Sequence, residues 1–509
     1  MLSGWFPRAV SALTDSSTFG YVLEVDWDGD GNFNSELDNI TAYTMAVDCV
    51  RGRNYASQLT GRSQAGSLQA VLKNRDGRFS SFLASGPLYG DILPGRKVRL
   101  RTKFPQYVLW TGVLDRIEPR TAPGLDAVAT LYASGVFVKL SGPNNKVSPP
   151  ALADTTTGAA VQAILDEAGW DSSRIIDPGN VEMRRWFIEN AGALSALQEM
   201  EDAEQGFLYE GLAWDIVFES RYNRDVNHLT AEVIYSDDTA LTYKYESIDQ
   251  SDPLREIFNV FEATVQPYEV DSSAVLWTLS GETPSLAAGS SRTYIAAAST
   301  VGGESVAYVE EWVTPVMGTD ITQTGVSDSD IAISVSKTAR TMFITVTNNH
   351  ASAAATITLM QARGTPVLKL NAFKISDEDA ASQAAYGRRT YPLPSPWYGN
   401  SAFAEGTAEY VLDRHAEPRP ILALGFTASK SSALRLESLQ RQISDRVTVE
   451  ADNNALLGIN GDFYVEAIQH RLSPGPLHQT KLFLSPAEAD PGYWLLDVDE
   501  LDAGTKLAY

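Results

Sequence analysis

The chain has 509 residues, and its 44% hydrophobic and 20% charged residues argue against wholesale disorder and against a membrane protein. Its 40 basic and 64 acidic residues give a formal net charge of −24, which disfavours nonspecific nucleic-acid binding because phosphates would be repelled. The single cysteine, Cys49, excludes an internal disulfide, and five scattered histidines leave no Cys/His zinc cluster. No secretion signal is visible at the start, and the length predicts about three or four domains.

The first motif is an acidic loop behind a predicted strand. LEVDWDGDGNF, residues 23–33, spaces three aspartates two apart before Gly31, whose sharp turn brings later oxygens back toward a hard cation such as calcium. An EF-hand would place its bidentate acid at Leu37, and a helix would precede the loop where a strand does here. The alternative is a solvated turn without metal. The predicted calcium ligands are Asp26, Asp28, Asp30, the carbonyl of Asn32, and Glu36 or Asp38.

From residue 20 to about 145, alternating strands are broken by Gly, Pro and Asn/Asp turns. In GRKVRLRTKF, residues 95–104, apolar residues point one way and a basic row points the other. The row could face an acidic neighbouring chain or DNA, or it could be a solvated face paired with local carboxylates. Its members are Lys97, Arg99, Arg101 and Lys103.

Two short amphipathic helices follow, in residues 154–170 and 190–206, where apolar residues recur at helical spacing. The stretch GFLYEGLAWDIVFESR then returns to alternation, so a small α+β unit is predicted over about 150–225. Residues 270–368 are rich in Ser, Thr and Ala, and their strand spacing predicts an inserted β-sandwich-like domain. Helical signals recur after it, with Ser376 expected as an N-cap and Asp379 at the capping-box position.

The last β region echoes the first. GRKVRLR, YVLWTGVLDRIEPR and LDAVATLYA have counterparts in SDRVTVE, GDFYVEAIQHRLSPG and HQTKLFLS. Each set runs from a basic-Val strand through an aromatic hairpin strand to a closing alternating strand. This order suggests a duplicated barrel.

Motifs for catalysis are mostly absent, since the sequence has no phosphate loop, no G-x-S-x-G and no H-E-x-x-H. The carboxylates of EMEDAEQG could suit a glycosidase, but Glu201 and Glu204 are expected on a solvated helix face. The five histidines, without a regular partner, are expected to be structural. We therefore predict that the chain is not an enzyme.

These motifs, in their order, resemble the baseplate hub proteins and related minor tail proteins of tailed bacteriophages. The resembling stretches include VDWDGDGNF, GRSQAGSLQAVLKNRDGRFS, PLYGDILPGRKVRLR and LSALQEMEDAEQGFLYE, and they extend from about residue 20 to 485. The resemblance implies a mainly β fold with small α+β parts and two related hub-type β-barrels. The predicted domains are a first barrel with the calcium-like loop (1–150), a small α+β domain (151–235), connecting strands (236–269), the insert (270–368), helices with the second barrel (369–490) and an acidic tail (491–509).

The same resemblance implies a structural protein of the virion tail tip, made in the host cytoplasm. Three copies would form a ring that joins a sixfold tail tube to a threefold tip, and DNA would pass through its channel. The implied partners are two further copies, the tail tube or a distal tail protein, and a tip or fibre protein, with DNA only in transit and no membrane insertion.

A calcium-stabilised adhesin or carbohydrate-binding tail protein is the alternative, and a tail-associated wall hydrolase is a third candidate. The sandwich-like insert favours the adhesin, as do aromatics that could be exposed, although these residues are also ordinary core anchors. They are Trp277, Trp312, Trp397 and Tyr398.

Overall fold

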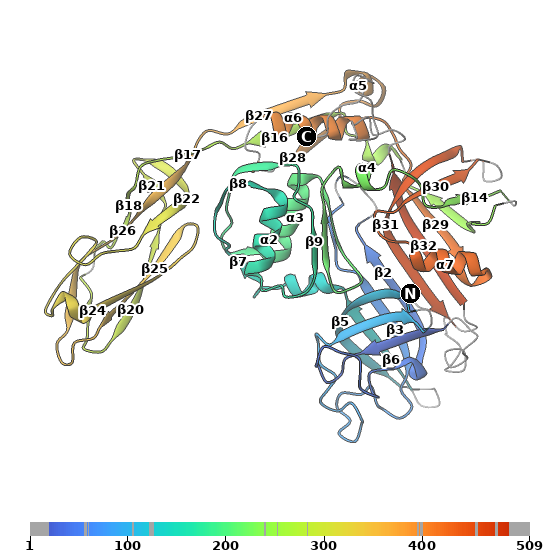
Figure 1. The fold of residues 1–509 in the computed structure, drawn as a ribbon, viewed down its shortest axis with the longest axis horizontal. Helices are drawn as coiled ribbons and strands as arrows, with labels where there is room; N and C mark the ends of the chain where they lie inside the picture. Colours follow the sequence, from blue (N-terminus) through green and yellow to red (C-terminus); the bar gives the residue numbers. More distant parts are fainter. Residues whose placement is uncertain are drawn as a thin grey trace.

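The computed structural model describes residues 20–487, apart from 55–58, 60, 104–105, 122–126, 239–240, 252, 282, 394–396, 398–400, 453–456 and 474–476. Twelve strands form one continuous sheet that contains both of the echoing β regions (Figure 1). The first region contributes β1 (Tyr21–Val25), β2 (Thr44–Gly52), β3 (Ser67–Lys73), β4 (Lys97–Thr102), β5 (Val108–Arg120) and β6 (Val128–Ser134). The second contributes β14 (Ile234–Ser236), β15 (Ser247–Gln250), β29 (Leu422–Thr427), β30 (Arg446–Ala451), β31 (Ile459–Ser473) and β32 (Leu477–Pro486).

The echo in the sequence corresponds to a repeat in strand order. The first region runs β1-β4-β5-β6-β3-β2, and the second runs β14-β30-β31-β32-β29-β15. In both, the basic-Val strand pairs with the first half of a long strand, and the closing strand pairs with its second half. We refer to these regions as the first and second repeats.

Both long strands also carry an irregularity at the same place. The register of β5 with β6 shifts between Leu114 and Arg116, and that of β31 with β32 shifts between Val465 and Ala467. An acid sits in each shift and accepts a hydrogen bond from a serine nineteen residues later: Ser134 donates to Asp115 at 2.6 Å, and Ser485 donates to Glu466 at 2.7 Å. A shared bulge with a shared side-chain partner marks the two hairpins as structural equivalents.

The mainly β class with small α+β parts is confirmed. The paired strands within the described residues do not close into two separate barrels, however, because β2 of the first repeat pairs antiparallel with β31 of the second. This pairing runs from Val47 opposite Leu472 to Gly52 opposite Ala467. The two repeats therefore share one hydrogen-bonded sheet, while each keeps its own hydrophobic core.

A small α+β unit lies against the first repeat. Its helices are α2 (Thr157–Glu167) and α3 (Ala193–Glu204), and its strands are β7 (Lys146–Val147), β8 (Leu152–Thr156), β9 (Arg174–Ile176), β10 (Glu182–Trp186), β11 (Ala191–Gly192), β12 (Phe207–Glu210) and β13 (Ile216–Glu219). Thr156 caps α2 by accepting from Ala159 N. Of the apolar stripe expected from helical spacing (Val161, Ile164, Leu165 and Ala168), the first three are fully buried and Ala168, at the C-cap, is half-buried. Burial of that stripe docks the helix.

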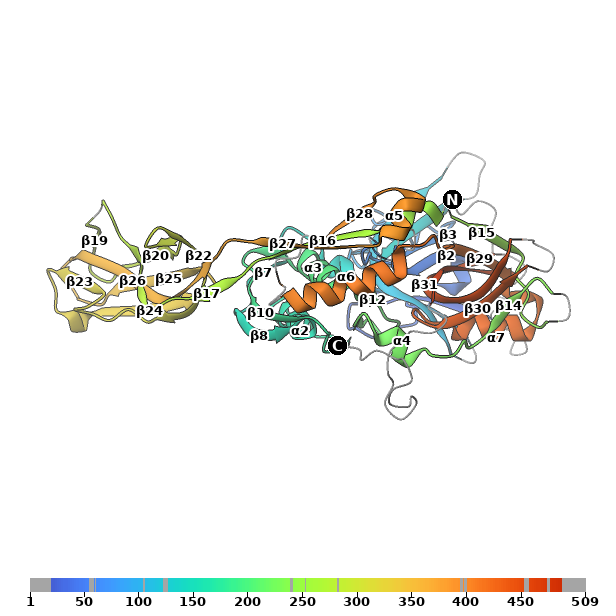
Figure 2. The ribbon, with the colours of Figure 1, turned by 90° about the horizontal axis from the view of Figure 1, so that it is seen from above.

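The insert is a β-sandwich that projects away from the rest of the molecule (Figures 1 and 2). One sheet contains β17 (Tyr268–Val270), β18 (Ala274–Thr278), β19 (Ser285–Leu286), β21 (Thr300–Val301), β22 (Glu304–Val313), β23 (Ile321–Thr324) and β26 (Ala355–Lys369). The other contains β20 (Ser291–Ala297), β24 (Ile331–Lys337) and β25 (Thr341–Asn348). The two sheets enclose a core of their own. The insert joins the body through β16 (Val260–Val265) and β27 (Phe373–Glu378), which pair with each other.

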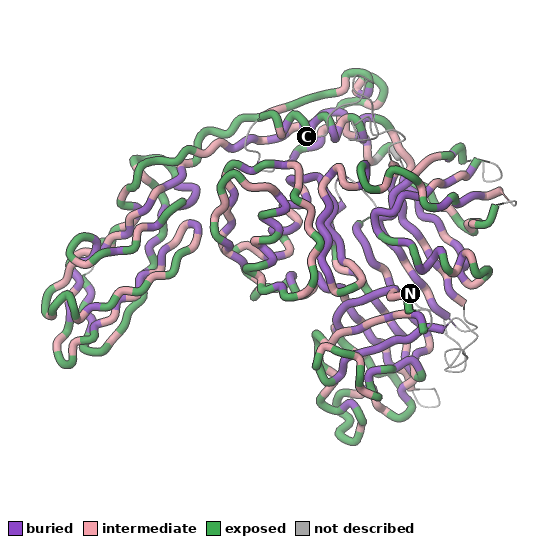
Figure 3. The backbone as a smooth tube through the Cα atoms, in the orientation of Figure 1, coloured by how far each residue is buried: buried purple, intermediate pink, exposed green. Residues whose placement is uncertain are grey.

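The remaining helices cover the body. They are α4 (Asn223–Asn227), α5 (Ala380–Tyr386), α6 (Ser401–His415) and α7 (Ser432–Gln440), and β28 (Thr390–Leu393) pairs with β16. The predicted cap of α5 was wrong: Asp379 is its N-cap and accepts from Ser382 N at 2.8 Å, whereas Ser376 lies within β27. Buried residues run through the strands of both repeats and through the α+β unit (Figure 3).

Candidate functional site

The acidic loop gathers three of its predicted ligands. Asp26, Asp28 and Asp30 each place a carboxylate oxygen within 4.8 Å of the others. Asp26 is buried, and its two oxygens accept from the backbone N of Gly29 and Gly31 at 2.9 and 3.0 Å. Burial, together with the neighbouring Asp28, raises the pKa of Asp26, whereas hydrogen bonds led by that from Asn32 N lower the pKa of Asp30. The loop therefore concentrates negative charge at one buried and two exposed carboxylates.

The other predicted ligands are placed differently. Asp38 is buried beneath the loop, where its oxygens accept from Trp27 N and Ser35 N. Glu36 is exposed. The side chain of Asn32 donates to the carbonyl of Asp30 at 3.3 Å. Asp38 thus braces the turn, and calcium binding by the loop stays a prediction.

Basic and aromatic side chains connect this loop to the α+β unit. Phe33, at the end of the loop, stacks on Trp214 with ring centroids 5.8 Å apart. Arg99 lies over the Phe33 ring at 4.3 Å, and Lys97 lies over the Trp214 ring at 5.4 Å. Lys97 also donates to the carbonyl of Gly31 at 3.3 Å. The loop therefore fastens the first repeat to its neighbour within the chain.

The basic row has partners inside the chain. Arg99 and Arg101 both pair with Glu24 of β1, at 2.8 and 2.6 Å, and Glu24 is only 4% exposed. Lys97 donates to the carbonyl of Gly31 in the acidic loop, and Lys103 is exposed. The alternative of a face paired with local carboxylates therefore describes Arg99 and Arg101. A role for the row in contacts with another chain stays a prediction.

A buried ionic network lies where both repeats meet the α+β unit. Arg53, just after β2, binds Glu201 of α3 at 2.9 Å and Glu466 of β31 at 3.4 Å. Arg224 of α4 binds the same Glu466, and the two guanidinium groups lie 4.9 and 3.6 Å from the ring of Phe207. Burial alone would raise the pKa of Glu466, but Arg224 and Arg53 lower it to about 2. The network is buried, since the side chains of Arg53, Arg224 and Glu466 are at most 3% exposed.

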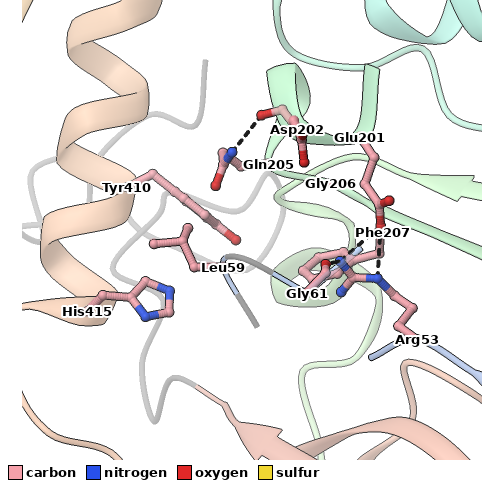
Figure 4. Close-up of a pocket in the computed structure, with 10 residues that line it drawn as sticks. All are labelled: Arg53, Leu59, Gly61, Glu201, Asp202, Gln205, Gly206, Phe207, Tyr410 and His415. Atoms are coloured by element: carbon pink, nitrogen blue, oxygen red, sulfur yellow. Dashed lines mark hydrogen bonds and ion pairs between the residues drawn. The ribbon is translucent and has the colours of Figure 1, made fainter. Parts of the chain in front are cut away.

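The cavity beside this network is small. It has a volume of about 10 Å³, room for a single water, and is lined by residues from α3, α6 and the segment after β2 (Figure 4). Burial raises the pKa of Asp202 at its edge to about 6, although Arg62 opposes this from 2.5 Å. The cavity is too small to bind a sugar or a peptide.

The acids of α3 are not on a solvated face, which corrects the sequence interpretation. Glu201 and Glu204 are 3% and 0% exposed. Glu201 binds Arg53, while Glu204 accepts from Thr157 Oγ1 and from backbone N atoms that include Val181 N. The carboxyl oxygens of both residues hold neighbouring segments in place. Helical periodicity could not show this, because the partners are distant in sequence.

The structure also bears on the histidines and on the aromatic residues considered for an adhesin. His470 and His478 are buried partners, with Nδ1 and Nε2 3.0 Å apart between β31 and β32, and burial lowers the pKa of His478 to about 3. Trp312 and Trp397 are each only 6% exposed, and Trp277 is half-buried. Tyr398 lies outside the described residues. The aromatic argument for an adhesin surface is therefore weakened.

Sequence reasoning missed one acidic group. His228, Glu232 and Asp445 place ligand atoms within 4.8 Å of one another at the edge of the second repeat. Arg441 lies among them and binds Glu232 at 2.9 Å and Asp445 at 3.1 Å. The guanidinium supplies the positive charge that a metal would otherwise supply.

None of the described helices is long and apolar enough to cross a membrane.

Comparison with known proteins gives structural matches only, since no family model and no curated protein matches the sequence. A tail protein from Neisseria meningitidis MC58 aligns over 92% of this chain and 98% of its own, with 11% identity and a TM-score of 0.50. The 43 kDa tail protein of prophage MuSo2 from Shewanella oneidensis also aligns over 92% of this chain and 98% of its own, with 10% identity and a TM-score of 0.46. Prophage tail protein gp18 from Listeria monocytogenes EGD-e aligns over 92% of this chain and 95% of its own, with 11% identity and a TM-score of 0.42.

The match to the Neisseria protein covers most of this chain and almost the whole length of that protein. At this level of identity it concerns the fold. The resemblance noted in the sequence is thereby confirmed at the level of the fold: the chain shares the fold of this tail protein.

Proposed function

We propose that this chain is a structural protein of a phage tail that forms a ring at the distal end of the tail. The observation that carries the proposal is the full-length likeness to the Neisseria tail protein, which spans 98% of that chain. The chain's own architecture supports it, because buried ion pairs and a continuous sheet hold its two repeats in a fixed relation.

The duplicated repeat explains how a threefold ring could match a sixfold tube. Three copies, each with two repeats, present six similar units and can join a sixfold tail tube to a threefold tip. A closed ring requires a heterologous contact in which the first repeat of one copy meets the second repeat of the next. Tube and tip proteins would then occupy the two faces of the ring.

DNA would pass through the centre of this ring without being held. The net charge of −24 suits such a channel, because each retained phosphate contact would slow the passage. In this role the chain performs no reaction of its own. The acidic loop acts as a clamp on the first repeat, strengthened by calcium.

Imaging of the assembled particle, with this chain labelled, tests the proposal. We expect three copies around an open channel at the tail tip. A copy number not divisible by three, or a position away from the tip, would contradict it.

A further inference from the structure

One connection between strands has different surroundings in the two repeats. Residues 74–96 join β3 to β4 in the first repeat, and residues 428–445 join β29 to β30 in the second. In the two strand orders, β3 and β29 hold the fifth place, and β4 and β30 hold the second. The two segments therefore link equivalent strands, and we call them the first and second connections.

The second connection reaches from its own repeat into the other. It contains α7, whose Leu434 packs in the core of the second repeat, whereas Leu439 packs in the core of the first. Just past α7, the carbonyl of Arg441 and Oε1 of Gln442 accept from Arg51 of β2, at 3.1 and 2.9 Å. The second connection thus has an inner apolar anchor and an outer one, and the outer anchor holds the two repeats together.

The first connection has the same inner anchor, but its outer apolar side chains meet water. Phe79 and Leu88 are 0% and 2% exposed and belong to the core of the first repeat. Phe82 is 98% exposed, and three more large apolar side chains of this connection are at least 39% exposed: Leu83, Tyr89 and Leu93. The outer half of the arrangement seen at α7 is therefore present here without the surface that it would contact.

The exposed segment is ordered and uncharged. Its backbone makes successive turns, in which N–H groups donate to the carbonyl three residues earlier at 2.8–3.2 Å, from Gly77, Ser80, Leu83, Gly86 and Tyr89. The stretch FSSFLASGPLYG, residues 79–90, has no charged side chain, although the chain has a net charge of −24. Because the backbone is already fixed and no charge is desolvated, docking of this segment costs little. Aromatic side chains without charged neighbours are typical of the centre of a protein interface.

We propose that the first connection docks, through Phe82 and its exposed neighbours, onto the second repeat of a neighbouring copy. The expected position is the one that corresponds to α7 on the first repeat. There the contacted strand is β2, and its counterpart is β15, because β2 lies next to β3 and β15 lies next to β29. Leu254, in the 3-10 helix Pro253–Glu256 that follows β15, is 46% exposed and offers apolar surface at this place.

The duplication favours a second copy as the occupant. In a closed ring of alternating repeats, each repeat meets a repeat of the other kind on both sides. The second connection meets a first repeat within the chain, so the first connection is expected to meet a second repeat. Since its apolar side chains are exposed within the chain, that second repeat belongs to another copy. The inference rests on the ring of the proposed function and names a segment that closes it.

A photocrosslinker at position 82 tests the contact on the full chain. Benzoylphenylalanine in place of Phe82 should give covalent dimers on irradiation, and mass spectrometry should place the linked peptide of the second copy near β15. The same group in place of Ile295, which is 61% exposed on β20 of the insert, is the matched control and should crosslink far less. Links that map away from the second repeat, or that join position 82 only to a different protein of the particle, would overturn the inference.

Removal of the exposed ring provides a second test, with mass photometry as the readout. Phe82→Ser removes apolar surface that the contact buries, so ring formation should weaken by about 10-fold or more, whereas Ile295→Ser should leave it unchanged. The thermal midpoint of the monomer should be the same in both variants, which shows that the fold is intact. Rings that form equally well with Phe82→Ser would overturn this inference alone. A wild-type chain that stays monomeric at all concentrations would overturn the proposed ring itself.

Discussion

The two repeats have the same hairpin, bulge and acid–serine pair, but different neighbours. In the first repeat, Asp115 is half-buried and its side chain binds Ser134. In the second, Glu466 is 1% exposed and binds Ser485, Arg53 and Arg224. One position of the duplicated fold is thus a half-buried acid in the first repeat and the centre of a buried network in the second.

The difference shows that duplication fixes the local geometry of the acid, while its neighbours determine how much it contributes to the free energy of unfolding. A carboxylate that water can reach contributes little to stability. A buried carboxylate shared by two buried guanidinium groups contributes much more, because its removal breaks two buried ion pairs at once. The predictions below test this contrast, from the largest expected effect to the smallest.

Removing the bulge acid should have very different effects in the two repeats. Glu466→Ala removes the nearest carboxylate of buried Arg224 and leaves Arg53 with Glu201 alone, so we expect the free energy of unfolding to fall by about 3–5 kcal/mol. Asp115→Ala, at the equivalent position, should cost less than about 1 kcal/mol. Urea unfolding followed by tryptophan fluorescence measures both. Similar losses for the two variants would show that the repeats are energetically alike.

The attachment of the α+β unit to the first repeat should weaken as pH rises. Glu210 accepts from Gly66 N and Phe137 N, and burial, only partly offset by these bonds, raises its pKa from 4.5 to about 7. Because the folded state holds the proton more tightly, the free energy of unfolding should decrease by about 3 kcal/mol between pH 4.5 and 7 and level off above. Glu210→Gln should remove this contribution to the slope. Glu118→Gln, on an exposed acid, is the control, and an unchanged slope in Glu210→Gln would exclude Glu210 as its source.

The insert should be dispensable for both repeats. Val270 lies opposite Val367, so an Asn-Gly turn can replace residues 271–366. The deletion removes the Arg185–Glu310 ion pair and the packing of Tyr308 on Phe187, and we expect it to cost less than about 2 kcal/mol. Solubility, ring formation and the unfolding midpoint are the measurements. Unfolding of the remainder would mean that the insert belongs to the core.

Calcium should affect the first repeat alone, because the acidic loop follows β1. Excess calcium should raise the thermal midpoint of the chain by about 2 °C through preferential binding to the folded state. Calorimetry should show binding heat that Asp28→Ala removes and Asp171→Ala, on an exposed acid elsewhere, retains. Identical melting with calcium and with a chelator would leave the loop as a hydrogen-bonded turn without a metal role.

Local patterns in the sequence determined much of this fold. Alternation predicted the strands around Val98 and the sandwich-like insert, and the order of basic-Val, hairpin and closing strands predicted the repeat. Helical spacing predicted the buried stripe of α2. These features depend on residues close in sequence, whose periodicity reflects which face each element buries.

Tertiary structure alone decided how those elements combine. The pairing of β2 with β31 joins residues that are hundreds of positions apart in the sequence, and the ion pair of Arg53 with Glu466 spans a similar sequence separation. Whether Glu201 is solvated, or whether Arg99 meets Glu24 or a neighbouring chain, depends on such long-range contacts. A carboxylate on a helix has the same periodicity whether it faces water or a buried guanidinium, so only the packed structure distinguishes a surface charge from the centre of a junction.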